Sequence, residues 1–174
     1  WMVFLVVLAG SVVRMTGSGM GCPDWPKCFG LMVPPTEASQ VTWQEGETYE
    51  AGRMLVAHDQ LWVAQRDLTA EDFLLEQARG DWQPYTKHDY AVFNPVHTWV
   101  EFINRLLGAL AGLPALLLFV LAALARDMKT WLLSLLALVA LGFVAWLGKL
   151  VVDGNLIPHS ITIHMLGALA ILCI

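Results

Sequence analysis

The apolar residues of this chain lie in long blocks rather than in amphipathic stripes. Two blocks, 98–125 and 131–152, are long enough as helices, at about 1.5 Å per residue, to cross a hydrocarbon core of about 30 Å. Two shorter blocks, 1–16 and 160–174, lie at the ends of the chain. The pattern predicts an all-α fold, a polytopic transmembrane helix bundle with four spans.

The two end blocks are short for a membrane span, which needs roughly 20 residues. A helix that ended inside the bilayer would leave its last carbonyls unpaired in hydrocarbon. We therefore expect the parent protein to continue beyond both ends. A secretory signal peptide is the alternative for the first block, but no small-residue cleavage site separates it from Arg14 and the glycines that follow.

A long polar segment, 17–97, separates the first two blocks, and it carries twelve acidic and five basic residues. The short turn ALARDMKT between the second and third blocks holds Arg126 and Lys129. Positive charge in a short loop favours the cytoplasmic side. We therefore expect an integral protein of the bacterial cytoplasmic membrane with the 17–97 loop on the outer, periplasmic side.

Within this loop the stretch LTAEDFLLEQAR predicts one surface helix. Thr69 is the expected cap, with Glu71 and Asp72 placed favourably in the first turn. The stretches WQEGETYEAG and GDWQPYTKHDYAVFNP are rich in turn residues and are expected to be irregular.

Composition supports a membrane protein and excludes one class of partner. Hydrophobic residues make up 57% of the chain and charged residues 14%, against roughly 45–50% and 25% in soluble domains. The net charge of −5, without any basic run, argues against nucleic acid as a partner.

Polar residues in or beside the spans gather toward one face of the predicted bundle. Burying such groups in a membrane is costly, so they are functional candidates, although interfacial snorkelling also explains single cases. Glu101, Asn104 and Arg105 share one helix face, which suits either a ligand clamp or a plain Glu101–Arg105 ion pair. The full set is Arg14, Glu101, Asn104, Arg105, Lys149, Asp153, His159 and His164.

His164 differs from the other histidines, because it lies about one turn inside an apolar helix. An imidazole there needs a partner and commonly finds a metal, a heme or a carboxylate; a structural role is the alternative. His159 is five residues away on a different face, so the two should not ligate one iron. His58 and His88 are expected in solvent, and His97 at the interface.

Cys22 and Cys28 flank PDWPK just after the first block. The outer side of the membrane is oxidising, so a disulfide is plausible. Two prolines between the cysteines favour a tight bend that brings the sulfurs together. Two thiols without a nearby histidine make zinc binding a poor alternative.

These residues resemble a known family. GSVVRMTGSGMGCPDWPKCFG, HTWVEFINRLLG, GKLVVDGN and ITIHM are similar to the amino-terminal half of the heme A synthase family. That family joins two four-helix halves into eight helices, so the resemblance implies that residues 1–174 form the first half and that the carboxyl-terminal half is absent from this chain. It also implies oxidation of a methyl group of heme O to a formyl group, which makes heme A for cytochrome oxidase.

The resemblance also assigns roles to single residues. Glu101 corresponds to the acidic residue needed for activity, His164 to the iron-ligating histidine of the fourth span, and the Cys22–Cys28 pair to the loop cysteines. Arg14 is a candidate partner of heme propionates. Heme b is the implied cofactor, and heme O is the implied substrate.

The second span departs from the family pattern. Many members have E-x-x-H-R there, whereas this chain has EFINR, with Asn104 in place of the histidine and Arg105 retained. An amide is a poor iron ligand. Either His164 alone holds the heme of this half, with an open axial position, or the second span does not ligate the iron.

Two rival functions and several partners stay open from sequence. A non-catalytic membrane heme-binding or electron-transfer protein would also display Arg14 and His164. A thiol–quinone oxidoreductase fits an outer cysteine pair, but the C-x5-C spacing is unlike that chemistry. The expected partners are the lipid bilayer and heme O, with heme O synthase, an electron donor and a second copy of the chain as further candidates.

Overall fold

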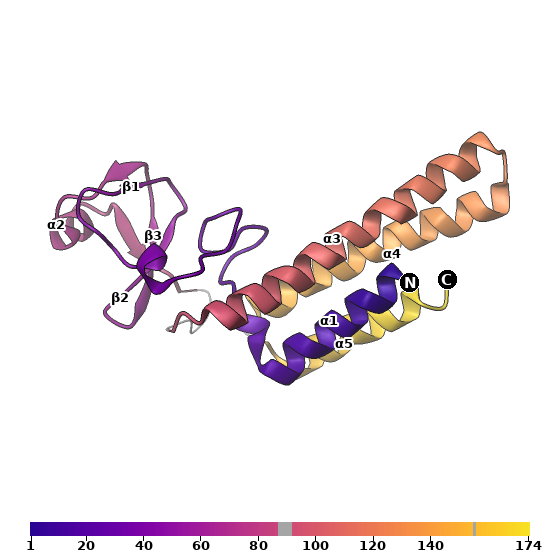
Figure 1. The fold of residues 1–174 in the computed structure, drawn as a ribbon, viewed down its shortest axis with the longest axis horizontal. Coiled ribbons are helices and arrows are strands. Elements are labelled where there is room, and N and C mark those ends of the chain that lie inside the picture. Colours follow the sequence, from indigo (N-terminus) through magenta and orange to yellow (C-terminus); the bar gives the residue numbers. More distant parts are fainter. Residues whose placement is uncertain (87–91, 155) are drawn as a thin grey trace. The chain divides into compact units, whose positions relative to one another are not determined.

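A computed structural model describes residues 1–86, 92–154 and 156–174 (Figure 1). The chain divides into two compact units, residues 1–17 with 103–174, and residues 18–102. The first unit is built from apolar helices, and the strands of the described chain lie in the second unit.

Two helices have the length and composition of membrane spans. They are α3, Pro95–Leu124, with 30 residues, and α4, Met128–Asp153, with 26 residues. Many of their large apolar side chains are exposed, among them Leu113, Leu124 and Val139. So much exposed apolar surface suits a lipid surround and not water. The two longest blocks of the sequence are therefore the two membrane-length helices that the pattern predicted.

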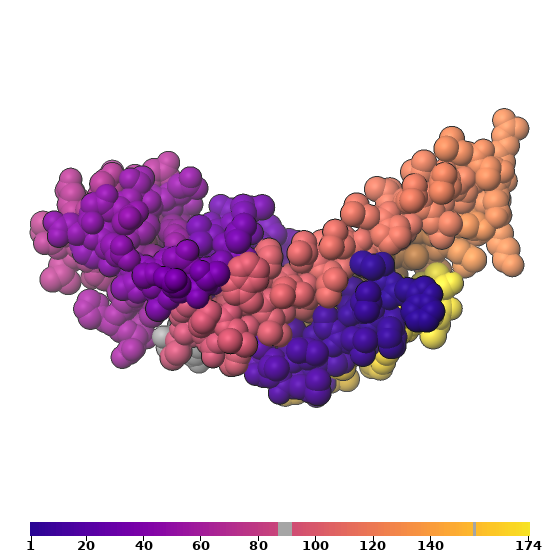
Figure 2. Space-filling view, in the orientation of Figure 1, coloured from indigo at the N-terminus to yellow at the C-terminus, as the bar shows by residue number. Residues whose placement is uncertain are grey.

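The end blocks also form helices, which are shorter. Helix α1, Met2–Thr16, ends at Gly17, whose φ of 69° is left-handed and whose N–H bonds to carbonyls of the last turn. Helix α5, Pro158–Ile171, begins with proline in its first turn. Helix α5 packs against α4 and against α1. In the space-filling view, the ends of α3 and α4 that meet at their connecting turn extend beyond α1 and α5 (Figure 2).

The loop unit contains strands, so the all-α prediction is wrong for this segment, although the chain is mostly helical. Strands β2, Met54–Ala57, β3, Gln60–Ala64, and β5, Trp82–Pro84, form an antiparallel sheet in the order β2-β3-β5. Strands β1, Thr48–Tyr49, and β4, Leu68–Thr69, pair antiparallel. Short 3-10 turns at Ser18–Met20 and Ala38–Val41 precede the strands.

Three expectations for the loop need correction. The stretches WQEGETYEAG and GDWQPYTKHDYAVFNP are not wholly irregular, because they contain β1 and β5; residues 87–91 of the second stretch, including His88, lie outside the described residues. The predicted helix is short, α2, Phe73–Ala78, and its cap is Asp72, whose carboxylate accepts the N–H groups of Leu74 and Leu75. Thr69 lies three residues before that cap, in β4, where it is paired with Thr48 of β1.

The loop unit has its own core around a buried carboxylate. Glu76 on α2 is fully buried and accepts the indole N–H groups of Trp43 at 3.1 Å and Trp82 at 2.8 Å, together with the backbone N–H of Glu71 at 2.6 Å. Burial alone would raise the pKa of the Glu76 carboxyl, but these hydrogen bonds hold that pKa below its ordinary value. The helix is therefore not merely a surface helix, since it supplies the polar centre of an aromatic cluster.

Replacing Glu76 with Gln should destabilise the loop unit by about 1–3 kcal/mol, because one acceptor is lost where three donors converge. Since the folded-state pKa lies below the unfolded one, the carboxylate's contribution is complete above its ordinary pKa of 4.5 and is lost as pH falls through the folded-state value. Glu76→Gln should flatten this acid sensitivity. Urea-dependent proteolysis of the 41–86 region measures both effects in the purified protein.

The exposed Glu45 provides the control for this measurement. Glu45→Gln should leave both the urea midpoint and its acid dependence near those of the wild type. Equal behaviour of the two variants would contradict the role assigned to Glu76.

Candidate functional site

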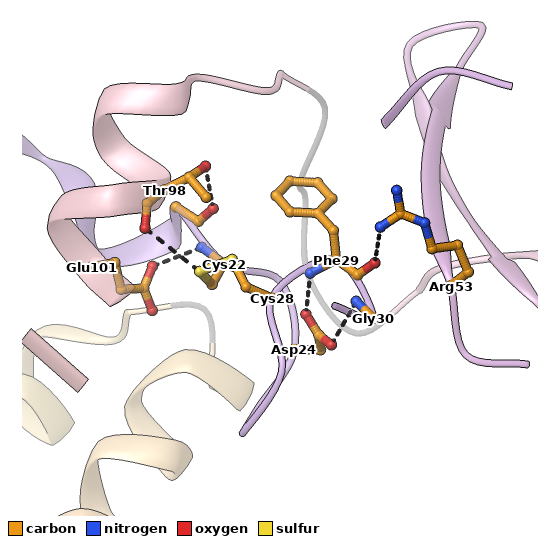
Figure 3. The surroundings of a disulfide bond; sticks show 9 residues. Cys22, Asp24, Cys28, Phe29, Gly30, Arg53, Thr98 and Glu101 are labelled. Atoms are coloured by element: carbon orange, nitrogen blue, oxygen red, sulfur yellow. Dashed lines mark hydrogen bonds between the residues drawn. A yellow bond between two sulfur atoms is a disulfide. The ribbon is translucent and has the colours of Figure 1, made fainter. Parts of the chain in front are cut away.

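The disulfide between Cys22 and Cys28 is present, with Cα atoms 4.9 Å apart, and both cysteines are fully buried. Figure 3 shows how the loop closes around it: the Asp24 carboxylate accepts the N–H groups of Phe29 at 2.7 Å and Gly30 at 3.0 Å. At Gly30 φ is 75°, and a Cβ would lie 2.3 Å from the Gly52 carbonyl oxygen. The predicted disulfide is confirmed, in a loop that the protein packs tightly.

The disulfide loop is tied to the rest of the loop unit by side-chain donors. The Arg53 guanidinium donates to the carbonyl of Phe29 at 3.1 Å and also to that of Gln40. The Tyr85 hydroxyl donates to the Pro23 carbonyl at 2.6 Å. The backbone N–H of Met54 also donates to the Phe29 carbonyl, at 3.1 Å, so the strand and the disulfide loop are joined at this point by both backbone and side-chain bonds.

The same loop is anchored to the first turns of α3. Glu101 is 3% exposed, and its carboxylate accepts the backbone N–H of Cys22 at 2.8 Å. The fully buried Thr98 donates its hydroxyl to the Gly21 carbonyl at 2.8 Å (Figure 3). A Cβ at Gly21 would lie 2.3 Å from the His97 carbonyl oxygen, so this approach requires glycine. Glu101 therefore holds a backbone group of the cysteine loop.

Thr98 and Gly21 are functional neighbours that sequence reasoning missed. Thr98 stands one turn before Glu101 on the same helix face, at spacing i, i−3. That spacing could have indicated Thr98 from the sequence. The close approach of Gly21 to α3 could not be predicted, because the two segments are far apart in the sequence.

In the helical unit, His164 is half-buried on α5. Its Nδ1 is buried and has no hydrogen-bond partner among the described residues. Such an orphaned nitrogen is costly unless another group completes it. The structure therefore keeps His164 as a ligand candidate.

Asn104 and Arg14 also belong to the helical unit. The Oδ1 atom of Asn104 is buried without a partner in the described chain, and a Cβ on Gly10 of α1 would lie 3.7 Å from it. The Arg14 guanidinium donates to the sulfur of Met165 at 3.0 Å, next to His164 in sequence. A thioether is a weak acceptor, so this cation retains capacity for a carboxylate. Arg105 is half-buried.

The remaining polar candidates are more ordinary. Lys149 and Asp153 form an ion pair at i, i+4, and both side chains are partly exposed, which suits the interfacial alternative. His159 and His58 are exposed, as expected for His58, whose ring also stacks on Phe73. His97 is half-buried.

The helical unit offers the groups that hold a heme. Heme proteins supply an imidazole for the iron and cations for the propionates, within apolar surroundings. His164 on α5 and Arg14 on α1 are side chains of these two types. Among the described residues, no three His, Cys, Asp or Glu side chains gather in a way that could hold a bare metal ion.

Comparison with known proteins gives one consistent family. A relative named Heme A synthase from Shewanella oneidensis is 26% identical over 168 residues, 97% of this chain and 38% of the relative. Heme A synthase from Paracoccus denitrificans is 31% identical, with 82% of this chain and 32% of the relative covered. Heme A synthase from Bartonella quintana is 32% identical, with 64% of this chain and 23% of the relative covered. No solved structure gives a significant match.

The chain thus spans about a quarter to two-fifths of the length of these curated relatives. The profile of one family, described as Cytochrome oxidase assembly protein (COX15-CtaA), matches residues 1–58 and 65–174. That match covers nearly all of both units. The chain belongs to this cytochrome oxidase assembly family of membrane proteins.

Proposed function

We propose that the protein is a heme A synthase, a membrane oxidoreductase that converts a methyl group of heme O into the formyl group of heme A for cytochrome oxidase. The names of the relatives support this function. The structural observation that carries it is the His164 imidazole on apolar α5, whose buried Nδ1 has no partner among the described residues. This chain would be the amino-terminal four-helix half of eight helices.

The heme of this half would be held by His164 at the iron and by Arg14 at a propionate, with Asn104 and Arg105 beside it on α3. When bound, the heme supplies the redox chemistry of the reaction. Heme O would be the substrate in this half, and heme b the electron-transfer cofactor. An amide is a poor iron ligand, so of the candidate residues in this half His164 is the one that would hold the iron, and Asn104 would contribute hydrogen bonds.

Glu101 is the residue we assign to proton handling or substrate orientation. Conversion of a methyl to a formyl group breaks C–H bonds and adds an oxygen atom, so the full protein would need an oxidant such as dioxygen, with electrons from its donor, as well as a residue that handles protons. A carboxylate that is nearly inaccessible to water is a suitable acceptor or relay. The hydrogen bond from the Cys22 N–H supports a second role, because it makes Glu101 an anchor of the disulfide loop.

The proposal places the protein in the bacterial cytoplasmic membrane with residues 17–97 on the periplasmic side. Arg126 and Lys129 in the α3–α4 turn support this orientation. Heme O synthase, an electron donor and a second copy of the chain are candidate partners of the full protein.

Two criteria separate the rival functions: the exposure of the cysteine sulfurs and the formation of a formyl-bearing heme. In a thiol–quinone oxidoreductase the sulfurs must be attacked by another thiolate, which requires exposure. Cys22 and Cys28 are both fully buried, which favours a structural disulfide. A non-catalytic heme-binding protein would bind heme similarly and would yield no formyl-bearing product.

His164→Ala should remove one heme from the purified full-length protein, because the iron loses its only side-chain ligand in this half. Absorption and electron paramagnetic resonance spectra of the wild type should show one heme with a single histidine ligand. Heme per protein, measured by pyridine hemochrome, checks the loss. Two bis-histidine hemes in the wild type would contradict ligation by His164 alone.

Glu101→Gln should abolish conversion of heme O while the heme stays bound, with product measured by liquid chromatography. Thr98→Val is the matched control, because Thr98 anchors the same loop through a single hydroxyl. It should cost about 0.5–1.5 kcal/mol of stability and retain activity. Equal loss of heme in both variants would show that Glu101 is only a loop anchor.

The double change Cys22→Ala and Cys28→Ala should weaken the fold by about 2–4 kcal/mol and leave some heme A formation. The measurement is heme A per folded protein after growth at reduced temperature. Complete loss of conversion, with folding and heme content intact, would instead support thiol chemistry.

A further inference from the structure

Gly148 on α4 lies directly against the His164 ring. A Cβ built on Gly148 would be 3.0 Å from Cε1 of His164 and 3.6 Å from each ring nitrogen. Ordinary van der Waals contacts of a Cβ begin near 3.4 Å. Any side chain at this position would therefore press on the imidazole edge, between the two nitrogens whose directions decide what the ring can bind.

The backbone carbonyl of Val144 suggests why the position next to the His164 ring is a glycine. Val144 stands four residues before Gly148 on α4, and its backbone carbonyl is an acceptor beside the His164 ring. Side chains on a helix lean toward its N-terminus, over the preceding turn, so a residue with a side chain at 148 would cover this carbonyl. A carbonyl oxygen in a helix retains a second lone pair. Glycine leaves that lone pair accessible to an imidazole N–H.

Metal-bound histidines almost always donate their other ring N–H to a carboxylate, a carbonyl or water. His164 has a buried Nδ1 that lacks a hydrogen bond among the described residues. The Val144 carbonyl beside the ring is an acceptor available to an imidazole N–H. A methyl group at position 148 would press on Cε1, between the two ring nitrogens, and so restrict how the ring can be oriented toward that carbonyl.

We propose that Gly148 is a positioning residue for the heme ligand: its missing side chain lets the His164 imidazole lie against α4, with Nδ1 directed to the Val144 carbonyl and Nε2 left for the iron. This inference rests on the proposed heme function. Gly148 acts through His164 and touches no substrate in this scheme.

Two other glycines supply matched controls. Gly142 lies on the same helix, and a Cβ there meets nothing within 4 Å. Gly167 lies on α5, and a Cβ there would be 2.9 Å from Cγ2 of Val144. Gly142→Ala therefore tests the loss of glycine in α4. Gly167→Ala tests pressure between α4 and α5 at a place where the imidazole is not among the nearest atoms.

The experiment uses the full-length protein purified from membranes, stripped of loosely held heme and titrated with hemin. Gly148→Ala should weaken binding at the His164-dependent site by about 10–100-fold, the usual effect of losing a ligand's supporting contact. It should also alter the spin state of that heme in electron paramagnetic resonance. Gly142→Ala should match the wild type, and Gly167→Ala should lower thermal stability without changing the heme spectrum.

A double-mutant cycle covers the case in which Gly148→Ala folds poorly. If the cost comes from the imidazole, Gly148→Ala should lower the melting temperature much less in a His164→Ala background than in the wild type. An equal cost in both backgrounds, or a wild-type heme spectrum and affinity in Gly148→Ala, would overturn the positioning role. If His164→Ala itself retained full heme, the heme assignment would fail instead, which separates the two outcomes.

Discussion

Within lipid, each polar group must find its partner inside the protein, and this constraint shapes the whole chain. Backbone groups meet it by forming the long helices α3 and α4, although Pro114 inside α3 removes one helix hydrogen bond. Side chains meet it only in part: the imidazole of His164 and the amide of Asn104 each keep one buried atom without a partner among the described residues. An unpaired buried group costs about 1–3 kcal/mol. Proteins keep unpaired buried polar atoms mainly where a bound ligand supplies the missing interaction.

Within the loop unit, the first turns of α3 anchor the cysteine loop. Thr98 and Glu101 bind backbone groups of the cysteine loop, and Arg53 and Tyr85 hold the same loop from the strand side. The disulfide loop thus connects the strands to α3 within one unit. Because Glu101 accepts the Cys22 N–H, a change in the disulfide loop would alter the contacts of the carboxylate that we propose handles protons.

Sequence patterns predicted what local physics decides. The blocks at 98–125 and 131–152 became helices because lipid leaves an apolar chain few alternatives, and the cysteine pair closed across a proline-rich bend. The strands were missed because they are two to five residues long and pair at a distance, as β3 does with β5. Pairing in β4 also moved the α2 cap from Thr69 to Asp72. Gly148 opens the quoted segment GKLVVDGN, but its contact with His164 could not be predicted, since that contact arises only from packing between α4 and α5.

Asn104 fits the same reasoning as His164. An amide is a poor iron ligand, yet it both donates and accepts hydrogen bonds. Its Oδ1 is buried without a partner in the described chain, beside Gly10, where the small residue leaves room. The resemblance thus implies a hydrogen-bonding group at Asn104 where many family members have a histidine. Under the proposed heme function, iron held at Nε2 would fix the His164 ring so that Nδ1 can bond to the Val144 carbonyl, and a hydrogen-bond donor near the heme would complete the Asn104 oxygen.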